Sequence, residues 1–164
     1  MKKIKIIISI FCFCFTMISC TKDDKNIQPI DYPIDIPFTE YSLAGTSCNW
    51  NLIYGEGYDY EKIIIINSKE ELNNYVKCIG ESSYHEIDFT KFTLLLANGI
   101  ASSSYEYVGC VSLLIFSDKN YNMEIDLFLT ELTSLTPWQV PIIVKKIDED
   151  SVINLIINNL ISQK

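Results

Sequence analysis

The sequence predicts an α+β fold: one β-rich domain with an antiparallel sheet of about six strands and one short helix. Short apolar runs of strand length recur after residue 38, one segment alternates apolar and polar residues, and one segment has helical spacing. The 164 residues leave room for one domain of roughly 125 residues, enough to bury a core. We therefore expect a leader at 1–19, a tether at 20–37 and a domain at 38–164.

The first 19 residues have the pattern of a signal peptide. Lys2, Lys3 and Lys5 precede an apolar run at 6–18, which is shorter than the about 20 residues of a membrane span. The run ends in Met17-Ile18-Ser19-Cys20, which resembles the lipobox of bacterial lipoproteins. The resemblance implies cleavage before Cys20 and lipid on that cysteine, which would bind the chain to a membrane. The alternative is an ordinary secretory signal.

The residues after Cys20 suggest where the chain is delivered. Lys22, Asp23 and Asp24 resemble the surface-export signal of lipoproteins in Bacteroides-like bacteria, which implies the outer membrane and exposure at the cell surface. The alternative is a solvated polar tether. The segment up to residue 37 is polar and contains three prolines, so we expect an extended, semi-rigid stalk.

The first half of the domain contains two expected strands and the helix. Residues 40–52 and the isoleucine run at 62–67 read as strands, and the glycine-spaced segment 54–58 reads as a loop. Ser68-Lys69-Glu70-Glu71 has the pattern of a capping box. Apolar residues at helical spacing follow as far as Ile79, and Gly80 is expected to end the helix.

The second half is expected to be mainly strands. Residues 92–97 form an apolar run, and 105–116 and 121–129 read as a hairpin around Ser117-Asp118-Lys119-Asn120. Residues 140–145 read as a strand in which Pro141 suits an edge or the strand's start. Residues 151–160 fit either a strand or a helix, and we favour a strand.

Residues 68–143 resemble the C-terminal domain of the spirochaete protease-complex protein PrcB. The resemblance rests on the helix start at Ser68, on Asp88-Phe89-Thr90-Lys91 before a strand, and on Thr136-Pro137-Trp138 before the last matching strand. These motifs are structural, and the family's paired glycines are replaced by Ser103-Ser104. The resemblance implies a small β-rich module that partners a protease.

Composition and cysteine content narrow the function classes. The formal net charge is −8, and all acidic residues follow the leader, which makes nucleic acid a poor partner.

Besides Cys20, the mature chain has Cys48, Cys78 and Cys110, for which one disulfide and one buried free thiol is the simplest arrangement. We expect no metal and no cofactor, because no ligand spacing is present. His85 is the only histidine, so a catalytic Cys–His pair has no other support.

The first functional hypothesis is a non-catalytic protein-binding module, either protease-associated or inhibitor-like. Aromatic side chains give large contact areas at low entropic cost. The candidate contacts, each of which could instead be a packing residue, are Tyr54, Tyr58, Tyr60, Tyr105, Tyr107 and Trp138.

Two alternatives belong to other classes. One is an immunity lipoprotein that protects its producer from a secreted toxin, since acidic charge suits a basic effector. The other is a hydrolase that uses two carboxylates with separated pKa values, drawn from Asp59, Glu61, Asp88 and Glu106. We predict no catalytic residues and no enzymatic activity.

Overall fold

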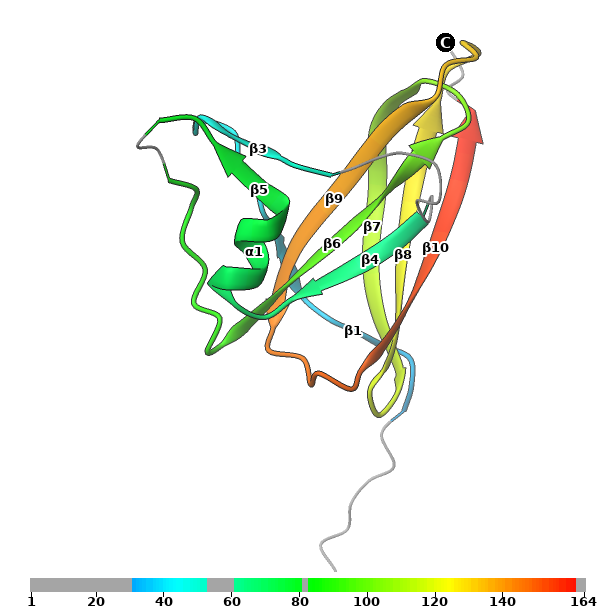
Figure 1. The fold of residues 1–164 in the computed structure, drawn as a ribbon. Helices are drawn as coiled ribbons and strands as arrows, with labels where there is room; N and C mark the ends of the chain where they lie inside the picture. The colour runs from blue at the N-terminus through cyan, green and yellow to red at the C-terminus, as the bar shows by residue number, and fades with distance from the viewer. Residues whose placement is uncertain (1–30, 53–60, 81–82, 162–164) are drawn as a thin grey trace, which may run out of the picture. The chain divides into compact units, whose positions relative to one another are not determined.

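Two four-stranded sheets pack face to face, and a small third layer covers the other side of one of them (Figure 1). The computed structural model describes residues 31–52, 61–80 and 83–161. The first sheet has the order β1 (Ile34–Asp35), β7 (Tyr105–Ser117), β8 (Asn120–Leu129), β10 (Val152–Ile161). The second has the order β2 (Phe38–Glu40), β9 (Thr136–Lys145), β6 (Phe92–Ala101), β4 (Glu61–Ile66). The third layer comprises β3 (Cys48–Trp50), β5 (Val76–Cys78) and α1 (Lys69–Tyr75).

The single β-rich domain with one short helix is confirmed for the described residues. The prediction of one antiparallel sheet of about six strands is wrong, because the strands form three sheets and β10 pairs with β8 in parallel. The sequence pattern of one strand does not indicate which other strands become its neighbours. The short strands β1, β2, β3 and β5 also contain no apolar run by which they could be recognised.

The main core lies between the first and second sheets. Met123, Ile125 and Leu127 alternate along β8 and are at most 1% exposed, and Ile142 and Val144 of β9 meet them from the second sheet. Burying each such side chain contributes about 1.5–3 kcal/mol. This layer therefore holds the two sheets together.

The second sheet is buried on both faces, which explains its unbroken apolar runs. Residues 93–99 of β6 are all buried. Leu95 faces the main core, whereas Leu94 and Leu96 pack into a second cluster with Ile66 and with Leu72 of α1. A strand between two apolar layers needs no polar face.

The helix begins as predicted and ends earlier. The backbone N–H of Glu71 donates to Ser68 Oγ at 3.1 Å, and Glu71 Oε2 accepts from the Asn67 N–H at 2.6 Å. After Tyr75 the chain becomes extended and forms β5, and Gly80, at φ 73°, follows that strand. The predicted continuation to Ile79 is wrong because β5 pairs with β3.

The predicted strand at 40–52 is interrupted. β2 ends at Glu40, and a turn follows in which the Thr46 N–H and Oγ1 both donate to the Leu43 carbonyl, with Gly45 at φ 80°. Strand structure resumes only at β3. The turn redirects the chain from the second sheet to the third layer.

The folded part starts before the expected end of the tether. β1 lies within 20–37 and pairs with β7 (Ile34 opposite Ile115), and the Ile36 N–H donates to the Leu113 carbonyl at 2.8 Å. The chain then crosses to the second sheet and forms β2. Residues 34–37 are therefore part of the sandwich.

Pro141 lies in the middle of β9, an inner strand, so its predicted place at an edge or strand start is wrong. Its carbonyl accepts from the Tyr41 N–H at 3.0 Å, on the β2 side. The N–H and C=O of one residue in an antiparallel strand point the same way. The nitrogen of Pro141 therefore points to the β2 side, just beyond the end of β2. No backbone N–H is needed there for pairing, so the lack of one in proline costs no strand hydrogen bond.

The favoured strand at the C-terminal end is confirmed as β10. Its inward residues Ile153, Leu155 and Ile157 pack on the main core. β9 lies in the other sheet, so the chain crosses the sandwich twice between β8 and β10. This crossing allows β8 and β10 to run parallel.

Candidate functional site

Several predicted functional residues lie outside the described part of the chain. They are the lipidation cysteine, the export signal and three aromatic candidates: Cys20, Lys22, Asp23, Asp24, Tyr54, Tyr58 and Tyr60. These assignments stay predictions.

Two of the predicted aromatic contacts, Trp138 and Tyr105, pack on the main core. Trp138 is 0% exposed in the main core, and its indole Nε1 has no hydrogen-bond partner among the described residues. Tyr105 is half-buried against the same core. The prediction that Trp138 binds a partner is wrong, because the alternation of β9 directs this side chain between the sheets.

Tyr107 is the predicted contact that the structure places at the surface. It is 48% exposed and stacks on Phe128, with ring centroids 4.6 Å apart and an interplanar angle of 14°. Gly109 lies against the same ring: a Cβ there would be 2.5 Å from Phe128 Cε2. The absence of a side chain at Gly109 therefore leaves room for the Phe128 ring in its stacked position.

Tyr107 and Phe128 belong to the outward surface of the first sheet, which we call the open face. In β8 the outward residues alternate with the core residues, and β10 adds its own outward residues in register. Asn154 Nδ2 donates to Asn122 Oδ1 at 3.1 Å and Asn158 Nδ2 donates to Asp126 Oδ1 at 2.9 Å, which shows that both strands present one surface. The open face comprises Tyr107, Ser112, Leu114, Asn122, Glu124, Asp126, Phe128, Asn154, Ile156, Asn158 and Leu160.

The open face combines apolar side chains with negative charge. Ile156 and Leu160 are each 37% exposed. Glu124 and Asp126 lie between them and β7, and no lysine is among the residues of this face. Such a surface fits a partner that offers apolar and basic groups together.

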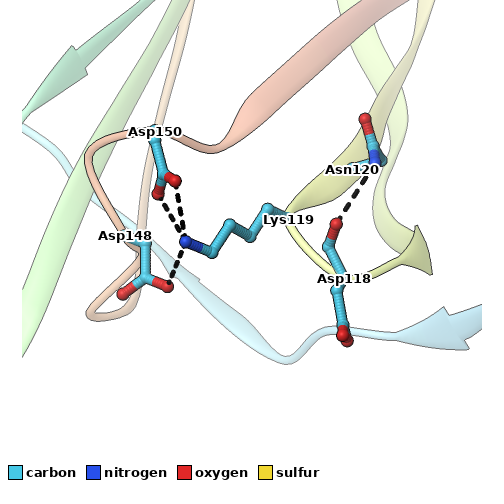
Figure 2. A network of polar contacts seen from close by, with 5 residues as sticks. All are labelled: Asp118, Lys119, Asn120, Asp148 and Asp150. Carbon is cyan, nitrogen blue, oxygen red and sulfur yellow. Dashed lines mark hydrogen bonds and ion pairs between the residues drawn. The ribbon is translucent and has the colours of Figure 1, made fainter.

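Lys119, at the end of the β7–β8 hairpin, is held by acidic residues of the β9–β10 connection (Figure 2). Its Nζ lies 2.7 Å from Asp150 Oδ2 and 3.5 Å from Asp148 Oδ2. The hydrogen bond to Asp150 raises the pKa of Lys119 and lowers that of Asp150. The Val152 N–H also donates to the Lys119 carbonyl at 2.8 Å. These contacts fix the start of β10 beside β8.

The carboxylates considered for a hydrolase do not converge. Glu61 pairs with Gly99 at one end of β6, whereas Asp88 precedes the other end, so roughly 20 Å of strand separates them. Glu106 belongs to β7 in the other sheet, and Asp59 lies outside the described residues. No acid–base pair forms from the three that the structure describes.

Asp88 has a local structural role. Its Oδ2 lies 2.9 Å from Lys91 Nζ, and its Oδ1 accepts from the Thr90 hydroxyl and N–H. These bonds, that of Lys91 first, lower the pKa of Asp88 from 3.8 to about 2. The motif that supported the family resemblance is thus a capped turn before β6.

The structure settles the cysteine pairing for the described residues. Cys48 and Cys78 face each other across β3 and β5 and form the disulfide, with Cα atoms 3.9 Å apart. Cys110 is free and exposed, so the expectation of a buried thiol is wrong.

In the part of the chain that the structure covers, no three His, Cys, Asp or Glu side chains are placed to hold a metal ion. Likewise, no described helix is long and apolar enough to cross a membrane.

A cleft of about 540 Å³ lies between the third layer and the second sheet. One wall comes from the β3 region, where Trp50 packs edge-on to Tyr41 with ring centroids 6.1 Å apart, and the other from β9. None of its lining residues is charged: Leu43, Ala44, Thr46, Cys48, Asn49, Trp50, Leu52, Pro137 and Gln139.

Of the residues that form the open face and the cleft, the sequence analysis proposed Tyr107 as a contact and did not propose the others. The alternation in 121–129 indicated an outward face but could not show that β10 would extend it. The cleft had no sequence signal, because its walls come from segments far apart in the chain.

Comparison with protein-family models, with curated proteins and with solved structures gives no match. The likeness to the PrcB domain and to lipoprotein signals therefore stays an expectation from the sequence.

Proposed function

We propose that this chain is a non-catalytic lipoprotein, anchored in the outer membrane by lipid on Cys20 and exposed at the cell surface, whose domain binds a protein partner. The open face carries the proposal. Both faces of the second sheet are covered, whereas the outward surface of the first sheet presents Tyr107, Ile156 and Leu160 to solvent beside two carboxylates. A half-apolar surface of this kind is typical of protein recognition.

The proposed partner is a secreted protein with a basic, apolar surface, and a protease held or restrained at the membrane is the candidate that the PrcB likeness favours. Glu61, Asp88 and Glu106, the described candidates for a hydrolase, lie apart from one another, and the proposal requires binding alone. The acidic residues would accelerate encounter with a basic partner.

The test is a cross-linked pull-down from native cells with a C-terminally tagged chain. Cys20→Ala is expected to leave the membrane fraction, which tests the anchor. Ile156→Ser is expected to lose the partner, whereas Leu135→Ser, at a residue that is 72% exposed and outside the open face, is expected to keep it. Equal recovery with both serine variants, or no specific partner with the native chain, would refute binding through this face.

An immunity lipoprotein is the second candidate, supported by the same acidic charge on the open face. Deletion of the gene would then make the producer sensitive to sibling strains, and Glu124→Lys would reproduce that sensitivity. Unchanged growth beside siblings would exclude it.

A further inference from the structure

The uncharged cleft contains a strand edge without a partner. β2 pairs with β9 only as far as Glu40 opposite Ile142, and the Tyr41–Pro141 hydrogen bond is the last contact of that ladder. β9 continues to Thr136, where it is paired on the other side with β6. Residues 136–140 therefore have no ladder partner on the β2 side among the described residues.

The directions of the backbone groups follow from the register. The Pro141 carbonyl points to the β2 side, and alternate residues of a strand point the same way. The N–H and C=O of Gln139 and the C=O of Pro137 therefore point away from β6, and both residues line the cleft.

The opposite wall presents a second edge. The Asn51 N–H donates to the Tyr75 carbonyl and the Ile79 N–H donates to the Ser47 carbonyl, so the alternate residues of β3 direct their backbone groups to β5. The intervening Cys48 carbonyl and the N–H and C=O of Trp50 point to the other side, where Cys48 and Trp50 line the cleft. Both walls thus offer hydrogen-bonding groups of extended backbone.

We propose that the cleft accepts an extended, uncharged peptide segment of a partner protein as an added strand beside β9. An added strand continues the line of β2 and pairs with Gln139, the usual mode of strand addition at a sheet edge. Residues 136–140 span ~17 Å, which fits a segment of about five residues. The lining selects uncharged side chains, because a charge brought into this cleft would lose solvation and gain no counter-ion. The site goes beyond the proposed function and lies on a different sheet from the open face.

Gln139→Pro and Gln139→Ala form a matched pair for the test. Both remove the same side chain, but only proline removes the N–H that points into the cleft, and this N–H is not used in pairing with β6. The probe is a phage-displayed library of random seven-residue peptides selected on the immobilised native domain. Selected peptides are expected to have uncharged centres, to bind Gln139→Ala as they bind the native domain, and to bind Gln139→Pro about tenfold more weakly or worse.

Three results would overturn the proposal: no enrichment on the native domain, charged centres in the enriched peptides, or equal affinity for the two variants. If Gln139→Pro does not fold, hydrogen exchange on the native domain replaces it, and the Gln139 amide is expected to be protected when a selected peptide binds. Unchanged exchange refutes strand addition. Ile156→Ser, which changes the open face, is expected to keep peptide binding if the cleft is the site. Peptide binding in the cleft can therefore be tested independently of partner binding at the open face.

Discussion

Gly109→Ala tests how firmly the aromatic pair of the open face is held. The added Cβ would lie 2.5 Å from Phe128 Cε2 and 3.0 Å from Cδ2, against ordinary carbon contacts of about 3.5–4.0 Å. Pressing the ring aside costs about 1–3 kcal/mol. Swinging it into solvent gives up its stacking on Tyr107, about 0.5–1.5 kcal/mol. The cheaper route sets the cost, so we expect the contact to lower the free energy of unfolding by about 1 kcal/mol.

A second effect has the opposite sign. Replacing glycine by alanine restricts the unfolded chain, which stabilises the fold by about 0.4–1 kcal/mol where the backbone allows it. The single variant can therefore show a small net change, and the coupling with Phe128→Ala is the decisive quantity. In the Phe128→Ala background the clash is absent, so Gly109→Ala is expected to be neutral or stabilising.

Urea unfolding of the native chain, both single variants and the double variant gives this coupling directly. A coupling of about 1 kcal/mol is expected from the competing routes. Equal effects of Gly109→Ala in the two backgrounds would show that the glycine is not there to make room for the ring.

Three further predictions concern the disulfide of the third layer, the turn at Asp88 and the hydroxyl of Tyr41. The disulfide closes a separation of 30 residues between Cys48 and Cys78, so replacing both by alanine is expected to lower the free energy of unfolding by about 3–4 kcal/mol; an unchanged urea midpoint would contradict this. The lowered pKa of Asp88, about 2 against 3.8, adds stability above pH 3.8 that is lost as pH falls towards 2. Asp88→Asn should therefore flatten the pH dependence of the melting temperature in this window, and parallel curves for the two proteins would count against the turn. Tyr41, whose pKa is raised to about 12 mainly by burial, donates its hydroxyl to the His85 carbonyl at 2.9 Å; Tyr41→Phe should cost about 1 kcal/mol in urea unfolding, and a native-like midpoint would show that this bond is dispensable.

Local signals in the sequence were reliable where they act within a few residues. The capping pattern at Ser68 placed the helix start, and the Asp118-Lys119 turn placed the β7–β8 hairpin, with Lys119 at φ 64°. The helix end failed because Val76 and Cys78 are drawn into pairing with β3, a segment about 30 residues earlier in the chain. Helical spacing at 72–79 described a local preference that tertiary pairing overrides.

For the candidate surfaces, too, local sequence was informative and the arrangement of the sheets was not predictable. Tyr107 could be proposed from its residue type, but whether Trp138 faces solvent or the core depends on which side of β9 the first sheet covers. That information lies in the arrangement of the sheets and not in residues 136–145. The strand edge at Gln139 depends on where β2 ends, and this end is set by the turn at Gly45, within what the sequence presented as one continuous strand.

The short pairing of β1 and β2 also determines how the domain would carry mechanical load. In a chain held by its N-terminal end, a pull first reaches the two paired residues of β1 on β7 and then the three paired residues of β2 on β9. The hairpin of β7 and β8 comes after these short ladders along the chain, and its pairing extends from Tyr105 opposite Leu129 to Ser117 opposite Asn120. If the chain is held at its N-terminal side as proposed, tension would detach β1 and β2 before β7 and β8 separate, so the first two strands would be released as extra chain while the open face stays assembled.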